Sequence, residues 1–242
     1  MSDAYWDAFF ALHRDLPREG PGQAQDVEWA AGIAGLAADA RICDAACGPG
    51  ADISALLKAA PRGHVTAMDK APQFVAQAHS MFGDHPQVSL SVSDMEDITG
   101  PFDMIWCAGA LYFMGIQEGL TTWRKALAPG GVIAFSEVCW FSDARPKAAV
   151  DFWQEYPAMT DVAGIARHVE AAGYRTLATR KLSDKAWEDY FAPLDRRIAN
   201  LRTGATADLA QVLDEAETEA ACWRAHRDAF GYLLSVVRPD DV

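Results

Sequence analysis

Apolar residues along the chain change repeatedly between a period of two and a helical period. Short buried strands are predicted over 41–47, 64–69, 88–92, 102–107 and 132–138. Amphipathic helices are predicted between them, because apolar residues recur there at spacings of three and four. Strands and helices that alternate in this way are typical of an α/β protein: a parallel sheet with helices on both faces, joined by right-handed crossovers.

The two ends of the chain are mainly helical in this pattern. The spacing of apolar residues over 4–16 predicts a helix that carries four aromatic side chains: Tyr5, Trp6, Phe9 and Phe10. A second helix is expected near 24–38. Beyond residue 142, helices are predicted over 146–156, 161–172, 184–201 and 206–229, and strand-like runs over 174–182 and 232–237. No Ser/Gly linker divides the chain, so we predict a single domain over 1–242.

Composition and charge narrow the range of partners. The chain has 242 residues, half of them hydrophobic, and its 21 basic and 34 acidic residues give a net charge of −13. Such an acidic chain repels phosphate backbones and anionic membrane surfaces, so we expect neither nucleic acid nor membrane as a partner. The five cysteines form no C-x-x-C pair, and the start Met1–Trp6 has no basic segment of a signal peptide. We therefore predict a cytoplasmic protein with reduced thiols.

A glycine turn between the first predicted strand and its helix favours a nucleotide-like ligand. Gly48 and Gly50 allow a sharp turn with no Cβ in the way of a ligand, and the next helix presents free N–H groups. Asp69 ends the second strand 69 − 50 = 19 residues later, close to the offset of about 20 at which a carboxylate accepts from ribose hydroxyls. Ile53 stands where a dinucleotide site needs its third glycine, which disfavours a pyrophosphate.

Four segments resemble the motifs of class I S-adenosylmethionine-dependent methyltransferases. They are the loop 44–50 (DAACGPG), 93–95 (SDM), 102–106 (FDMIW) and 127–133 (LAPGGVI). Aromatic segments farther along the chain resemble a bacterial branch of small-molecule methyltransferases. The resemblance implies a Rossmann-like, doubly wound, mostly parallel seven-stranded sheet with an antiparallel last strand. It also implies three parts: a helical N-terminal cover (1–40), a cofactor-binding core (41–138) and a substrate-side C-terminal part (139–242).

The resemblance also implies a set of cofactor-binding residues. The loop backbone would face the methionine part of S-adenosylmethionine, Asp69 would hold the ribose, and Asp94 with Met95 would contact the adenine edge. The complete set is Asp44, Ala46, Gly48, Gly50, Asp69, Lys70, Asp94, Met95 and Cys107. Ala46 departs from the family, which usually has glycine there, and its methyl group is expected to crowd the methionine end.

Methyl transfer is an in-line displacement, so the protein mainly has to position the reactants and exclude water. A base is needed only where the acceptor carries a proton, and no catalytic residue is assigned. Tyr112 and Glu137 are the candidate catalytic residues. The alternative for Tyr112 is a place in the pocket wall, and the alternative for Glu137 is a solvated carboxylate. Candidate substrate-binding residues, which core packing explains equally well, are Tyr112, Trp140, Trp153 and Tyr156.

Two other functions remain open on the sequence. A non-catalytic module that binds the adenosyl cofactor is compatible with Ala46 and with the lack of an obvious base. A nicotinamide-dependent oxidoreductase is less compatible, because Ile53 replaces a glycine and no Tyr-x-x-x-Lys pair is present. The six histidines have no metal-ligand spacing, so we expect no metal. We expect a small-molecule substrate and either a monomer or a homodimer.

Overall fold

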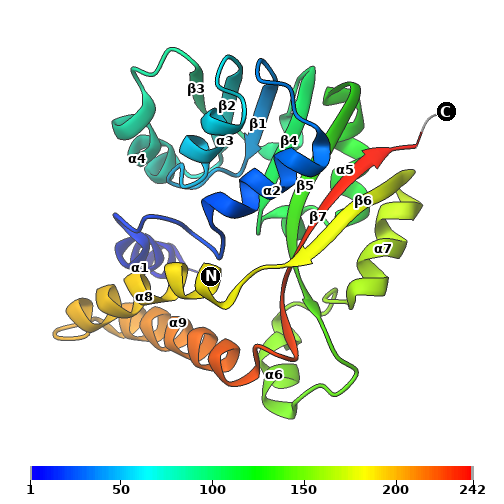
Figure 1. Ribbon diagram of the computed structural model, residues 1–242. Coiled ribbons are helices and arrows are strands. Elements are labelled where there is room, and N and C mark those ends of the chain that lie inside the picture. The colour runs from blue at the N-terminus through cyan, green and yellow to red at the C-terminus, as the bar shows by residue number, and fades with distance from the viewer. Residues whose placement is uncertain (1, 241–242) are drawn as a thin grey trace.

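The computed structural model describes residues 2–240, and its centre is a seven-stranded sheet in the order β3-β2-β1-β4-β5-β7-β6. The first five strands pair in parallel, and β7 runs antiparallel to β5 and β6 (Figure 1). This topology confirms the predicted mostly parallel sheet with an antiparallel last strand. The strands are β1 (Arg41–Ala45), β2 (His64–Asp69), β3 (Val88–Val92), β4 (Phe102–Ala108), β5 (Leu127–Trp140), β6 (Tyr174–Lys181) and β7 (Phe230–Pro239).

Helices cover both faces of this sheet, as the alternating pattern predicts. They are α1 (Asp3–His13), α2 (Ala24–Ala34), α3 (Ile53–Ala59), α4 (Pro72–Phe82), α5 (Ile116–Trp123), α6 (Lys147–Phe152), α7 (Val162–Ala171), α8 (Asp184–Leu201) and α9 (Ala207–His226). Helices α2 and α3 belong to one core cluster, whereas α5 and α7 belong to the other. One boundary differs from the pattern: the spacing of Leu120, Trp123 and Leu127 predicts a helix that reaches Leu127, but Leu127 begins β5 and pairs with Phe102.

Helices α8 and α9 form a separate layer across the carboxyl ends of the parallel strands. Both helices begin at a hydroxyl cap, because Ser183 accepts from the Ala186 N–H and Thr206 accepts from the Leu209 N–H. The two helices pack on each other through the rings of Trp187 and Trp223, which stack with centroids 5.0 Å apart, and Trp187 also contacts Tyr232 of β7. Since α8 and α9 join β6 to β7, the chain crosses the end of the sheet before it adds its last strand (Figure 1).

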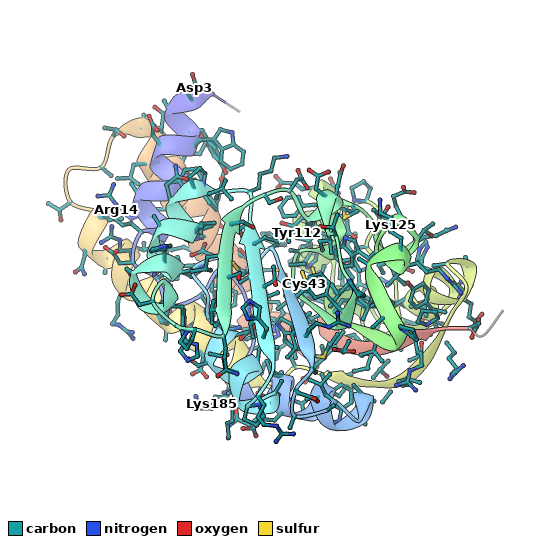
Figure 2. The ribbon with its side chains drawn as sticks, turned by 90° about the horizontal axis from the view of Figure 1, so that it is seen from above. Asp3, Arg14, Cys43, Tyr112, Lys125 and Lys185 are labelled. Atoms are coloured by element: carbon teal, nitrogen blue, oxygen red, sulfur yellow. The ribbon has the colours of Figure 1, made fainter. Side chains whose placement is uncertain are left out.

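Helix α1 packs on this layer, beside α8 and α9 (Figures 1 and 2). The Tyr5 hydroxyl donates to Glu215 Oε2 at 2.7 Å, and Arg197 donates to the Ala11 carbonyl at 2.8 Å. Phe10 meets Phe74 of α4 edge to face, with ring centroids 5.7 Å apart. Helix α1 therefore bridges the α8–α9 layer and α4. Among residues 2–240, no helix is long and apolar enough to cross a bilayer.

Candidate functional site

A cleft of about 1520 Å³ lies between the carboxyl ends of the strands and the layer of α1 and α9. Its walls come from the loop after β1, the ends of β2, β3 and β4, and the facing sides of both helices. This is where ligands bind in open α/β sheets, because the strand order reverses between β1 and β4 and leaves a crevice there.

The glycine loop turns from β1 into α3 at one wall of the cleft. Gly48 and Gly50 have positive φ values of 54° and 88°, and Ala46, with φ of 56°, also lies in the left-handed region. A side chain in this region is strained, typically by about 1–2 kcal/mol. Glycine avoids that strain, so Ala46 carries a backbone cost in addition to the bulk that the sequence predicts.

Asp69 connects the ends of β1 and β2 at the cleft edge. Its Oδ2 accepts the Gly48 N–H and its Oδ1 accepts the Ala71 N–H, both at 2.8 Å. Burial raises the pKa of this carboxyl, and the backbone hydrogen bonds oppose the shift. Each oxygen keeps a lone pair that a ribose hydroxyl can donate to.

Asp94 and Met95 follow β3 at the next position along the wall. Asp94 accepts from the Glu96 N–H at 3.1 Å and from Lys70 Nζ at 2.7 Å, and the Lys70 hydrogen bond lowers its pKa. Met95 is buried, and its carbonyl accepts from Trp123 Nε1 at 2.7 Å. These hydrogen bonds fix the turn that places Asp94 and Met95 at the cleft wall.

Asp44 provides a direct test of whether an adenosyl cofactor fits this cleft. The residue is 3% exposed and lines the cleft, and its Oδ2 has no hydrogen-bond partner in the described part of the chain. Burial and the nearby charge of Asp52 raise its pKa well above the ordinary value. An unpartnered buried carboxylate oxygen is costly, and a cationic ligand group would satisfy it. The ammonium of a methionyl group has that charge, so these residues fit S-adenosylmethionine.

The segment after α1 covers the glycine loop. His13 Nδ1 lies 2.5 Å from Glu19 Oε2, and a Cβ added to Gly48 would lie 3.2 Å from Glu19 Cγ. Burial raises the pKa of Glu19. Arg18 Nη2 lies 3.5 Å from Asp52 Oδ1. Side chains of the N-terminal segment therefore come into close contact with the loop that would hold the methionine part.

The other half of the cleft carries tyrosines and carboxylates. Tyr112 follows β4, Tyr190 comes from α8, Tyr232 from β7 and Glu219 from α9. Figure 2 shows Tyr112 near the middle of the view, whereas Lys185 lies at an outer edge. We call the set Tyr112, Tyr190, Tyr232 and Glu219 the acceptor pocket.

Glu137 lies behind the acceptor pocket on β5. It is 3% exposed, its Oε1 accepts from the Tyr156 hydroxyl at 3.1 Å, and its Oε2 has no partner among the described residues. Burial raises its pKa to about 7. The Tyr156 ring meets Tyr112 edge to face, with centroids 5.8 Å apart.

The structure brings most of the expected residues to one cleft. Those on its walls are Asp44, Ala46, Gly48, Asp69, Lys70, Asp94, Met95 and Tyr112. Gly50 packs against Ile53, Ala78 and Phe82 instead. The remaining candidates lie outside the cleft walls: Cys107, Glu137, Trp140, Trp153 and Tyr156. The rings of Trp140 and Trp153 pack on Phe230.

Several residues at the cleft were not expected from the sequence. Glu219 and Tyr232 lie far from every motif, whereas Tyr190 ends the aromatic segment 187–190, which carried no predicted site role. Asp52 and Glu19 sit close to the glycine turn, yet their partners Arg18, Trp106 and His13 come from other segments. No local spacing in the sequence marks these residues.

Comparison with known proteins finds similar methyltransferases. The family described as Methyltransferase domain matches residues 42–131, from β1 into β5. Residues 42–131 are therefore similar to that methyltransferase family, and the chain as a whole has the fold of S-adenosylmethionine-dependent methyltransferases of known structure. A methyltransferase from Geobacter sulfurreducens, whose structure holds S-adenosyl-L-homocysteine, shares the fold with a TM-score of 0.80 at 16% identity. That alignment covers 97% of this chain and 98% of the Geobacter chain.

Two relatives carry named methyltransferase activities. A trans-aconitate 2-methyltransferase from Streptomyces avermitilis is 27% identical over 166 residues, which cover 64% of this chain and 62% of that protein. A malonyl-[acyl-carrier protein] O-methyltransferase from Enterobacter lignolyticus is 30% identical over 110 residues, which cover 45% of this chain and 42% of that protein. This chain thus spans less than two thirds of the length of either relative.

Proposed function

We propose that this chain catalyses S-adenosylmethionine-dependent methyl transfer to a small-molecule acceptor. The observation that carries the proposal is the unpartnered, buried Oδ2 of Asp44 beside the glycine loop. It offers a negative charge at the point where the loop resemblance puts the methionyl ammonium. Asp69 and Asp94 lie along the same wall, at the ends of the next two strands.

Each cofactor-binding residue would then have a defined task. When bound, S-adenosylmethionine supplies an electrophilic methyl group on a sulfonium. Asp44 would hold the ammonium, and Asp69 would accept from the ribose hydroxyls while it keeps the Gly48 N–H in place. Asp94 and Met95 would contact the adenine. Gly50 and Cys107 would act indirectly, since both are buried behind the wall.

The residues of the C-terminal part would surround the acceptor. Tyr112 lines the cleft and can orient an acceptor, with Tyr156 and Glu137 behind it. Trp140 and Trp153 are farther from the cleft, so we propose that they support this wall from the core. The names of the two relatives, which specify trans-aconitate and a malonyl group on a carrier protein, support an acceptor other than nucleic acid.

Organisation and location complete the proposal. We propose a single methyltransferase domain with the N-terminal cover 1–40, the cofactor-binding core 41–138 and the substrate-side part 139–242. We also propose that it acts in the cytoplasm as a monomer or homodimer, without a membrane or nucleic-acid partner. The net charge of −13 supports the absence of a membrane or nucleic-acid partner, because it repels anionic polymers and surfaces.

Calorimetry with three ligands tests the cofactor. S-adenosyl-L-homocysteine and S-adenosylmethionine should bind with micromolar affinity, roughly −8 kcal/mol, and NAD should not bind comparably. Binding of NAD without any adenosyl ligand would refute the proposed function. Transfer of a labelled methyl group to members of an acceptor panel would separate an enzyme from a non-catalytic binding module. A protein that binds the cofactor but methylates no member of the panel would favour the module.

A further inference from the structure

The acceptor side of the cleft has an excess of negative charge. Among the described residues that line the cleft, the lysine and arginine side chains are Lys70 and Arg18. Both lie at the cofactor side, where Lys70 pairs with Asp94 at 2.7 Å and Arg18 lies 3.5 Å from Asp52. The acceptor side is lined by five carboxylates from α6, the turn after it and α9: Asp151, Glu155, Asp214, Glu215 and Glu219.

Some of these carboxylates are already compensated, but Glu219 is not. Asp214 pairs with Arg202 and Asp151 pairs with Lys147, each at 2.5 Å. Glu215 accepts from the Tyr5 hydroxyl. Glu219 forms no ion pair with a lysine or arginine of the described chain. Burial raises its pKa to about 7, and His13, which is itself paired with Glu19, opposes that shift.

Three tyrosines line the same cleft as this carboxylate: Tyr112, Tyr190 and Tyr232. Burial raises the pKa of each hydroxyl, and the charge of Glu219 raises it further. Tyrosine faces attract cations, and the attraction grows when the site is shielded from water. The acceptor pocket therefore combines one negative charge with three electron-rich rings.

Glu137 adds a second, independent indication of a cationic ligand. It is 3% exposed, and its Oε2 has no partner in residues 2–240. Its Oε1 accepts from the Tyr156 hydroxyl, and the Tyr156 ring meets Tyr112 edge to face, so Glu137 lies behind Tyr112. The half-buried Glu219 and the buried Glu137 thus lie in and behind the acceptor pocket, and no lysine or arginine that lines the cleft lies on this side to neutralise them.

Resting on the proposed function, we propose that the methyl acceptor is an amine that enters as an ammonium cation and is held by Glu219 within the acceptor pocket. An apolar body would suit the mouth of the cleft, where Trp6, Phe10 and Phe113 line the wall. A carboxylate acceptor would instead be repelled, because each of its oxygens would approach uncompensated negative charge.

The reaction balances with these groups. The bound ammonium gives one N–H proton to Glu219, which leaves a lone pair on nitrogen. That lone pair forms the new N–C bond to the methyl carbon as the C–S bond breaks, and the C–S electrons remain on sulfur. The products are the methylated ammonium, neutral S-adenosyl-L-homocysteine and a protonated Glu219 that returns its proton to water. A carboxyl whose pKa is near 7 is suited to accept and release a proton at neutral pH.

Three probes with a phenyl body test the charge preference: phenethylamine, 2-phenylethanol and phenylacetate. Binding is measured by calorimetry at pH 7.5 on the full chain saturated with S-adenosyl-L-homocysteine, whose sulfur is neutral. We expect phenethylamine to bind about tenfold more tightly than 2-phenylethanol, and phenylacetate to bind more weakly than both. Glu219→Gln should remove the preference for the amine, whereas Glu217→Gln, on the exposed side of the same helix, should keep it.

The outcomes separate this inference from the proposed function. If S-adenosyl-L-homocysteine binds but the amine binds no more tightly than the alcohol, or neither probe binds, the amine acceptor is refuted and the proposed function stands. Failure to bind S-adenosyl-L-homocysteine refutes the proposed function itself. A Glu219→Gln variant that keeps the amine preference but loses affinity for S-adenosylmethionine relative to S-adenosyl-L-homocysteine would assign Glu219 to the sulfonium and also refute the inference.

Discussion

Gly48 donates its backbone N–H to Asp69 Oδ2 at 2.8 Å, so the carboxylate that ends β2 holds the loop that ends β1. Ala71 donates a second backbone N–H to the other oxygen of Asp69. These bonds fix the carboxylate in one orientation before any ligand arrives, which lowers the entropic cost of binding. Asp69 therefore stabilises the loop as well as offering acceptors to a ribose.

Replacement of Asp69 by alanine should reduce both stability and cofactor affinity. We expect the free energy of unfolding to fall by about 1–3 kcal/mol, because two backbone N–H groups lose a charged partner. The affinity for S-adenosyl-L-homocysteine should fall by about 10- to 100-fold, as expected for lost hydrogen bonds to a charged group. Thermal unfolding and calorimetry measure the two effects.

Asp103→Ala is the matched control for this substitution. Asp103 accepts the Arg41 N–H at 2.7 Å at the opposite end of the sheet, so its loss should lower stability and leave cofactor affinity unchanged. If folded Asp69→Ala binds S-adenosyl-L-homocysteine as tightly as the wild type, Asp69 serves the loop alone.

The sequence was sufficient to predict the sheet and one wall of the cleft because both depend on local patterns. The strand, glycine turn and helix of 41–59 follow one another directly, and Asp69 and Asp94 mark the ends of the next two strands. The acceptor side is different. Glu219 and Tyr190 reach the cleft because Trp187 stacks on Trp223, and no pattern within α8 or α9 indicates which way that layer faces.

Ala46 shows the same limit at a single residue. Alanine in place of the family's glycine predicts crowding of a ligand. The φ of 56° at Ala46 could not be derived from the sequence, because it depends on how the chain turns after β1 to form the backbone hydrogen bond between Cys47 and Met68. Backbone strain and ligand crowding are separate effects. Three substitutions can distinguish them.

Ala46→Gly should raise stability by at most about 1 kcal/mol, because relief of the left-handed strain exceeds the added entropy of the unfolded chain. Ala46→Asn should nearly keep the stability of the wild type, since asparagine tolerates positive φ, but its larger side chain should weaken cofactor binding about tenfold. Ala46→Val should reduce both the stability and the affinity for the cofactor. Equal cofactor affinity in all three variants would contradict a close approach of the ligand at Ala46.

Glu137 should make stability depend on pH. Burial raises its folded pKa from 4.5 to about 7, so the folded protein binds the proton more tightly than the unfolded chain. Stability from this group is therefore fully present below about pH 4.5 and is lost as pH rises to about 7, by about 3 kcal/mol at most. Glu137→Gln should remove that loss.

The comparison is made by thermal unfolding of both proteins between pH 4.5 and 8. Asp44 and Glu219 also carry raised pKa values, and they contribute equally to both curves, so the difference between the proteins isolates Glu137. The Tyr156 hydroxyl can still donate to the glutamine carbonyl. Parallel curves across this range would show that Glu137 has an ordinary pKa in the folded protein.

The N-terminal cover should respond to the cofactor in one part and not in another. Helix α1 buries Leu12 fully and is tied to α9 and α8 through Tyr5 and the Ala11 carbonyl, so it is a fixed part of the core. The segment 14–22 is held near its two ends, where the Leu16 carbonyl accepts from Gln77 and the Gly22 N–H donates to the Ala186 carbonyl. Between these points, Arg18 and Glu19 make its polar contacts at the cleft. We expect hydrogen exchange to be slow over 5–12 with or without ligand.

Binding of S-adenosyl-L-homocysteine should slow exchange in 14–22, because a ligand on the glycine loop adds contacts beneath Glu19 and stabilises the ordered segment. Arg18→Ala should speed exchange there in the free protein, since the approach of Arg18 Nη2 to Asp52, 3.5 Å apart, is lost. Arg14→Ala, at an exposed position of the same segment, is the control and should leave the rate of hydrogen exchange in 14–22 unchanged. If residues 5–12 exchange rapidly in the free protein and become protected on binding, α1 itself closes over the cofactor and is not part of the fixed core.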